Sequence, residues 1–137
     1  MKISVVVSTY NRPDTLVKVL EGLVSQTRLP DEIIIADDGS TWETSRAVQP
    51  WLDRTDVRCI HVWQEDSGFR LARIRNKAIH SSEGDYLVFL DGDCIPERHF
   101  VEDHLTLASS GCFFQGKRVI VSQRATPDFS FSDTVSV

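Results

Sequence analysis

The stretch Tyr86-Leu87-Val88-Phe89-Leu90-Asp91-Gly92-Asp93 contains the pattern that decides the fold. Its first five residues form a short apolar run, and two carboxylates separated by one glycine follow at once. Apolar runs of this length are typical of strands buried on both faces of a parallel sheet. Asp-Gly is also a favoured dipeptide of surface turns, so residues 91–93 taken alone are open to that simpler interpretation.

Two further apolar runs end in the same way. Residues 3–8 lead into Thr9-Tyr10-Asn11-Arg12, and residues 33–36 lead into Asp37-Asp38-Gly39-Ser40. Helical spacing between the runs indicates strands alternating with helices, which implies parallel pairing through right-handed crossovers. Ligands of such sheets bind beyond the carboxyl ends of the strands. Three polar clusters on one rim therefore predict an α/β, Rossmann-like, mostly parallel sheet with a ligand site at this rim.

The remaining elements are predicted from periodicity and turn chemistry. Strands are expected at residues 57–63 and 119–121 as well as in the three runs above. Helices are expected after Asn11, after the capping-box-like residues 40–43, over residues 69–81, and after Pro96. Asn11 is expected to cap the first helix, and Pro50 to kink or end the second. Four residues of the third helix are predicted to face inward: Leu71, Ile74, Ala78 and Ile79.

Composition restricts the function. The chain has 137 residues, 41% hydrophobic and 26% charged, which fits one globular domain. Its net charge of −5 argues against a general nucleic-acid binder. No run approaches the roughly 18 apolar residues that span a bilayer. Three cysteines without CxxC spacing fit reduced thiols, so we expect a cytoplasmic protein, with peripheral association at the inner membrane face as an option.

The carboxylates at Asp91 and Asp93 can approach one point if the chain turns at Gly92. Carboxylate oxygens suit Mg²⁺ or Mn²⁺, and such ions usually keep positions open for substrate phosphate. A metal there would neutralise charge on a departing diphosphate. The position after a buried strand, on a rim with two other clusters, favours a metal site over a surface turn.

The other candidates bind ligand rather than metal. One carboxylate of Asp37 and Asp38 is interpreted as an acceptor for the N–H of a pyrimidine base, and the other as a turn or capping residue. The helix that follows Thr9-Tyr10-Asn11-Arg12 has N-terminal amides that favour anions. Arg75 and Asn76 are candidates for the diphosphate, although most of the charged residues 70–77 are expected to be a solvated helix face. The four histidines have no metal-ligand spacing.

The three clusters, in this order, resemble the signatures of family-2 glycosyltransferases. Residues 64–70 and 75–76 resemble a galactosyltransferase-like and chondroitin-polymerase-like subset, and so does Phe113-Phe114-Gln115-Gly116-Lys117-Arg118-Val119. The resemblance implies the A-type glycosyltransferase fold and inverting, hexosyltransferase-class activity in polysaccharide biosynthesis. It implies a nucleotide-diphosphate sugar donor, with UDP as the expected nucleotide, a glycan or lipid-linked saccharide acceptor, and Mn²⁺ or Mg²⁺.

Residue roles carried over by the resemblance fall into two groups. Asp93 would be the more direct metal ligand, with Asp91 near ribose and metal. The nucleotide-sugar-binding residues would be Thr9, Tyr10, Asn11, Arg12, Asp38, Gly68, Arg75, Asn76, Asp91 and Gly92.

The sequence departs from the family pattern in one respect. Members normally continue for about another hundred residues that include an acidic general base, and no such motif follows Asp93 here. We therefore expect a nucleotide-sugar-binding domain at residues 1–122, a tail at residues 123–137, and a C-terminally truncated chain whose catalytic base is unassigned. A binding fragment or subunit without transfer activity is the alternative. An unrelated dinucleotide-binding domain is disfavoured because residues 8–11 lack the glycines of GxGxxG.

Overall fold

A computed structural model describes residues 1–134. Four parallel strands form one sheet in the order β3-β2-β1-β4. The strands are β1 (Ile3–Thr9), β2 (Glu32–Asp37), β3 (Arg58–Trp63) and β4 (Tyr86–Asp91). The helices are α1 (Pro13–Val24), α2 (Trp42–Leu52), α3 (Leu71–Ser81) and α4 (Phe100–Leu107), with a 3₁₀ turn, η1 (Phe131–Asp133). The predicted parallel α/β sheet flanked by helices is confirmed.

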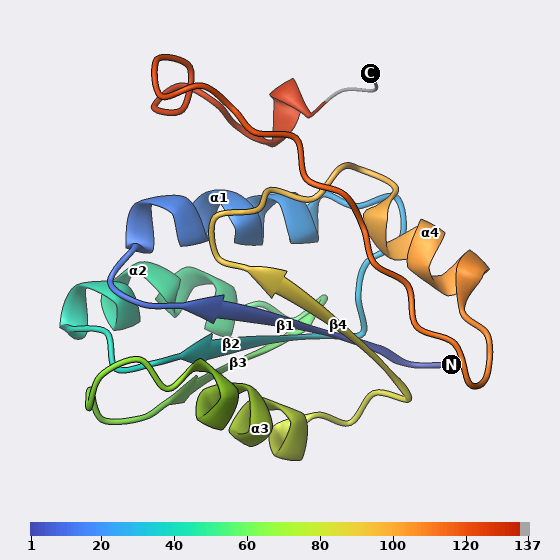
Figure 1. Ribbon diagram of the computed structural model, residues 1–137, viewed down its shortest axis with the longest axis horizontal. Helices are drawn as coiled ribbons and strands as arrows, with labels where there is room; N and C mark the ends of the chain where they lie inside the picture. Colours follow the sequence, from blue (N-terminus) through green and yellow to red (C-terminus); the bar gives the residue numbers. More distant parts are fainter. Residues whose placement is uncertain (135–137) are drawn as a thin grey trace.

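Helices cover both faces of the sheet (Figure 1). The larger core packs α1, α2 and α4 on one face, where Val5, Val7, Ile33 and Ile35 meet apolar helix residues. On the other face, Val6 and Ile34 pack against α3. Every residue of β1 and β2 is buried, which explains why both strands have continuous apolar runs rather than alternating ones. The sheet therefore aligns the carboxyl ends of all four strands at one rim.

Some predicted local details are wrong. Residues 119–121 form no strand and lie in an irregular segment, where Val119 and Ile120 are exposed. Asn11 does not cap α1, because it has a left-handed φ of 48° and the cap position belongs to Arg12. No capping box forms at residues 40–43, since Thr41 is the cap residue and makes no side-chain cap bond. Pro50 does not end α2, because the helix continues through it to Leu52.

The inward face of α3 is narrower than predicted. Ile74 and Ala78 are fully buried, whereas Leu71 is half-buried and Ile79 is exposed. Residues four apart lie on one helical face, and Ile79 follows Ala78 by only one residue. The extra 100° or so of rotation turns Ile79 away from the sheet.

The end of the described chain lies across α1 (Figure 1). Lys18 Nζ donates hydrogen bonds to the carbonyls of Pro127, at 2.9 Å, and Phe129, at 2.7 Å. The predicted tail at residues 123–137 is thus tied to the domain as far as it is described, and residues 135–137 lie outside the described residues. Within residues 1–134, no helix combines the length and apolarity needed to cross a bilayer.

At the amino ends of the strands, one buried carboxylate organises the sheet. Glu32 accepts hydrogen bonds from the Ser4 hydroxyl, from the backbone N–H of Glu83 and from Arg58. Burial acts to raise the pKa of Glu32, but these three donors outweigh burial and lower it. Glu32 is therefore an ionised structural group.

Candidate functional site

A cleft of about 420 Å³ opens at the carboxyl ends of β1, β2 and β4. Its walls come from the β1–α1 turn, the loop before α3 and the turn after β4. The lining residues are Ser8, Thr9, Tyr10, Arg12, Thr15, Asp38, Asp66, Gly68, Phe69, Leu71, Asp91, Gly92, Asp93 and Arg118. The three clusters that the sequence assigned to one rim therefore do meet in a single cleft.

Asp91 ends β4 beside Ser8 of β1, because these two residues are partners in the sheet register. Asp91 Oδ1 lies 3.1 Å from Arg75 Nη2 and 3.3 Å from Ser8 Oγ. Its Oδ2 lies 3.6 Å from Arg118 Nη1. The side chain is 47% exposed, so both oxygens have partners and still face the cleft.

Asp93 and Cys94 complete a cluster of potential ligands with Asp91. One ligand atom from each lies within 4.8 Å of the others. Burial raises the pKa of the Cys94 thiol, so at neutral pH the two carboxylates are the stronger donors. Nearby, the Thr9 hydroxyl is buried without a hydrogen-bond partner among the described residues. A pair of hard oxygen donors beside an unpaired hydroxyl fits Mg²⁺ or Mn²⁺.

Gly92 permits the turn that brings the carboxylates together. A Cβ atom at position 92 would lie 2.6 Å from the carbonyl oxygen of Ser8. The Gly92 N–H donates to that same carbonyl at 2.8 Å. Any larger residue would separate the turn from β1, so the glycine sets the position of both Asp91 and Asp93.

Asp37 and Asp38 lie in different environments. Asp37 is fully buried; it accepts the Ser40 N–H at 2.8 Å and lies 2.8 Å from His61 Nε2. It does not line the cleft. Asp38 does line the cleft. It accepts hydrogen bonds from Gln64 Nε2 at 2.6 Å and from the Arg70 N–H at 2.7 Å.

The two hydrogen bonds to Asp38 fix its plane. An ionised carboxylate has about four acceptor positions, so two remain after the bonds from Gln64 and Arg70. Asp38 is thus an oriented acceptor that can still receive an N–H from a ligand.

Tyr10 and Asp66 join two walls of the cleft. The Tyr10 hydroxyl donates to Asp66 Oδ2 at 2.7 Å. This hydrogen bond, together with the charge of Asp66, raises the pKa of Tyr10 and keeps it a neutral donor. Gly39 lets the backbone of Asp66 come this close to the neighbouring turn. Its φ is 99°, and a Cβ atom at position 39 would lie 2.5 Å from the Asp66 Cα.

The remaining predicted residues divide by position. Arg12 and Gly68 line the cleft with the residues above, and Arg75 supports Asp91 from α3. Asn11 lies beside the cleft, where its side-chain oxygen accepts the Thr41 N–H at 2.9 Å. Asn76 lies apart from the cleft, in a shallow hollow on the outer side of α3 with Arg73 and Lys77.

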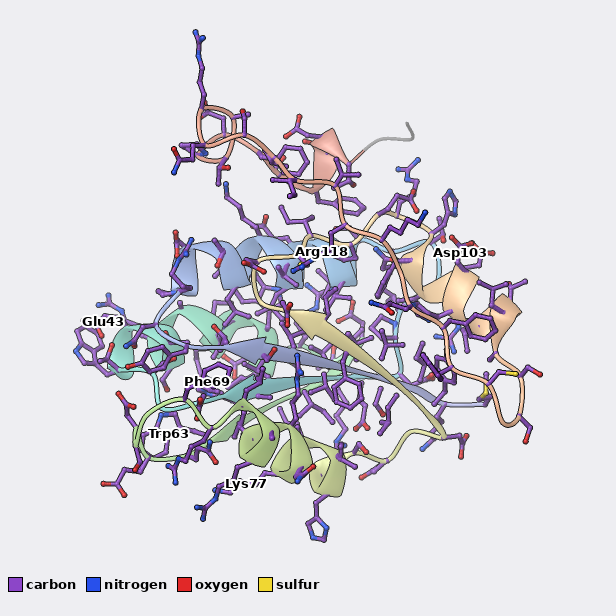
Figure 2. All side chains as sticks on the ribbon, in the orientation of Figure 1. Glu43, Trp63, Phe69, Lys77, Asp103 and Arg118 are labelled. Atoms are coloured by element: carbon purple, nitrogen blue, oxygen red, sulfur yellow. The ribbon has the colours of Figure 1, made fainter. Side chains whose placement is uncertain are left out.

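Sequence reasoning did not select several residues that line the cleft. Asp66, Phe69 and Arg118 belong to stretches whose resemblance was noted, but no spacing rule selects one side chain within them. Figure 2 shows Phe69 on the loop before α3 and Arg118 near the end of β4. Their positions depend on how these segments fold over the rim.

A parallel sheet with polar side chains gathered beyond its carboxyl ends is the arrangement of ligand-binding α/β domains. Residues 4–132 match the family model described as glycosyl transferase family 2. The chain belongs to this family.

Curated relatives support the assignment. The chain is 33% identical over 105 residues to a chondroitin synthase of Pasteurella multocida, covering 76% of this chain and 11% of that protein. It is 36% identical over 105 residues to a validoxylamine A glucosyltransferase of Streptomyces hygroscopicus, covering 75% and 23%. The chain thus spans between about a tenth and a quarter of these relatives.

Solved structures show the same fold. TarS residues 1–349 of S. aureus, in complex with UDP, match with a TM-score of 0.69 and 27% identity, over 77% of this chain and 31% of that one. The mannosyltransferase PcManGT of Pyrobaculum calidifontis, in complex with GDP-Man and Mn²⁺, matches with a TM-score of 0.70 and 25% identity, over 80% and 33%. The predicted A-type glycosyltransferase fold is confirmed.

Proposed function

We propose that this chain binds the donor of a glycosyl transfer, a nucleotide-diphosphate sugar and specifically a UDP-sugar. The observation that supports this most directly is the pairing of Asp38 with the Asp91–Asp93 turn in one cleft of about 420 Å³. An oriented base acceptor and a carboxylate pair are the two groups that a nucleoside diphosphate needs. The relatives include a protein solved with UDP and another solved with GDP-Man and Mn²⁺.

Each residue has a definite role in this proposal. Asp38 accepts the base N–H, while Gln64 and the Arg70 backbone hold it in plane. Thr9 and Tyr10 line the nucleotide pocket, and Arg75 keeps Asp91 oriented toward the cleft. Asp93 and Asp91 would hold Mn²⁺ or Mg²⁺, whose positive charge would stabilise the departing diphosphate.

The reaction proposed for the whole protein is inverting transfer to a glycan or lipid-linked acceptor. Inversion needs a carboxylate within about 3 Å of the acceptor hydroxyl. We assign none of the cleft carboxylates to this role. In this proposal Asp38 binds the nucleobase of the donor, and Asp66 accepts the hydrogen bond from Tyr10. Asp91 and Asp93 lie on the leaving-group side. We further propose a cytoplasmic setting, which the three free thiols support.

Donor binding without transfer is the second candidate function. It is favoured because every cleft carboxylate among residues 1–134 already has one of these other roles. General-base help typically contributes about 10²–10⁴-fold to a rate, so binding with little turnover is its signature.

Calorimetry and a transfer assay test both candidates. UDP should bind in the presence of Mn²⁺, and EDTA should abolish that binding. The same UDP affinity with Mn²⁺ and with EDTA rejects the metal site, and a chain that binds no UDP under either condition rejects donor binding. A radiolabelled-donor assay with a panel of sugars and glycan acceptors then separates the two. Turnover on the order of 1 s⁻¹ or faster would identify this chain as a complete catalyst.

A further inference from the structure

Arg118 brings a positive charge into the metal-binding corner of the cleft. It belongs to the crossing segment (residues 109–122), which follows α4 and has no helix or strand. Its Nη1 lies 3.6 Å from Asp91 Oδ2, and Figure 2 shows it near the end of β4. It also lines the cleft.

Asp91 therefore lies between two guanidinium groups that differ in how firmly they are held. Arg75, on α3, has a side chain 33% exposed, and its guanidinium lies 5.8 Å from the centre of the Phe89 ring. Arg118 has a side chain 73% exposed and comes from an irregular segment. Packing holds Arg75 in place, whereas Arg118 can leave Asp91 by side-chain rotation alone.

The position that Arg118 occupies is the one a divalent cation would use. Asp91, Asp93 and Cys94 present their ligand atoms within 4.8 Å of one another at this corner. A guanidinium next to Asp91 Oδ2 repels a second cation there. It is also well suited to bind phosphate, because its fork of N–H donors matches two phosphate oxygens.

We propose that Arg118 is an exchangeable counter-ion of the donor site. Without ligand it neutralises Asp91; when a divalent cation and a nucleoside diphosphate bind, it leaves Asp91 and pairs with the diphosphate. The proposal rests on the proposed function, since it needs the same corner to take the cation and the diphosphate. It makes the crossing segment a part of the donor site that changes partner on binding.

The proposal predicts effects of opposite sign on two affinities. Arg118→Gln removes a competitor, so Mn²⁺ alone should bind roughly two- to fivefold more tightly, as expected for an exposed ion pair. The same substitution removes a diphosphate contact, so UDP with Mn²⁺ should bind roughly tenfold or more weakly. A residue that merely anchors the segment would change both affinities in the same direction.

The experiment measures free Mn²⁺ by electron paramagnetic resonance and UDP binding by calorimetry. Lys117→Gln is the matched control, because Lys117 is adjacent and exposed, lies outside the cleft lining, and loses the same charge. Opposite shifts in Arg118→Gln, small shifts in Lys117→Gln, and a partial return of UDP affinity in Arg118→Lys support the proposal.

Three results overturn the inference. Mn²⁺ affinity that is unchanged or weaker in Arg118→Gln rules out competition. Equal changes in affinity in Arg118→Gln and Lys117→Gln would show that the effect comes from the loss of one positive charge and not from the position of Arg118. A parent chain that binds neither Mn²⁺ nor UDP overturns the proposed function together with the inference, whereas a parent that binds both leaves only the inference at risk.

Discussion

Two triads of serine, carboxylate and arginine lie on the same face of the sheet, at opposite ends. The closed triad consists of Ser4, Glu32 and Arg58, and the open triad of Ser8, Asp91 and Arg75. In each, a serine of β1 faces its register partner on a neighbouring strand. The side chain of Glu32 is 4% exposed and that of Asp91 is 47% exposed.

The difference shows what separates a structural carboxylate from one available to ligand. Glu32 has donors on both oxygens, including a backbone N–H, and its neighbours shut out water. Asp91 has the same kind of serine and arginine support but faces a cleft that also holds Asp93. The residue types are nearly alike, so the exposure of the carboxylate side chain distinguishes the two triads.

The largest expected effect comes from removing the second carboxylate beside the open triad. Asp93→Asn should weaken Mn²⁺-dependent UDP binding roughly a thousandfold, which corresponds to about 4 kcal/mol. Calorimetry with Mn²⁺ and UDP measures it. Asp103→Asn, the same change on the exposed surface of α4, should bind like the parent. Equal affinity in Asp93→Asn and the parent would remove the metal-site assignment.

A smaller loss of UDP affinity is expected from changing Asp38, the proposed acceptor for the nucleobase N–H. Asp38→Asn should weaken UDP binding by about 1.5–3 kcal/mol and reduce the preference for UDP over GDP and dTDP. Asp37→Asn is the matched control: because Asp37 is buried with His61, that change should lower stability and leave nucleotide preference intact. A parent that prefers GDP, or an Asp38→Asn variant with full selectivity, would contradict the assignment.

Breaking the closed triad should lower stability instead of binding. Glu32→Gln leaves Arg58 and a backbone N–H with a poorer acceptor, so unfolding free energy should fall by about 1–3 kcal/mol. Urea denaturation measures the loss. UDP affinity of the folded protein should stay the same, and a variant that binds UDP much less tightly while remaining folded would show that the two ends of the sheet are coupled.

The smallest expected effect is the pH dependence of the stability that Glu32 provides in the closed triad. The folded-state pKa of Glu32 is lowered, so its contribution to stability is complete above its unfolded pKa of about 4.3 and is lost as pH falls through the folded value. The stability difference between the parent and Glu32→Gln should therefore shrink below about pH 4. Glu21→Gln, on the exposed side of α1, is the control for loss of one carboxylate.

The sheet could be predicted because its central strands are buried on both faces and therefore consist of apolar runs. The caps could not. Asn11 accepts the Thr41 N–H, a contact 30 residues away, and this long-range bond replaces the local capping bond. Residues 119–121 have β-branched side chains but no neighbouring strand to pair with among the described residues, so propensity alone did not make a strand.

The same limit applies to the cleft. Asp38 follows the buried strand β2, whereas Asp91 ends β4 and Asp93 lies just beyond it. Only Val88 of β4 is buried, because β4 is at the edge of the sheet, so the prediction that this strand is buried on both faces is wrong. The geometry of a parallel sheet still fixes where these three residues lie. Asp66 and Arg118 are on irregular segments, whose path over the rim depends on packing that no periodicity encodes. Asn76 is the opposite case: Arg75 reaches Asp91, whereas Asn76, one position further along α3, lies in the separate hollow.

Gly39 has a consequence for how variants of this protein would be interpreted. The backbone of Asp66 lies so close to Gly39 that one hydrogen atom, in place of a methyl group, sets the separation of two walls of the cleft. A Gly39→Ala variant would touch no ligand, yet it would widen the gap that Tyr10 bridges to Asp66. Its phenotype would resemble that of a lost binding residue, although the cause would be the spacing of the main chain.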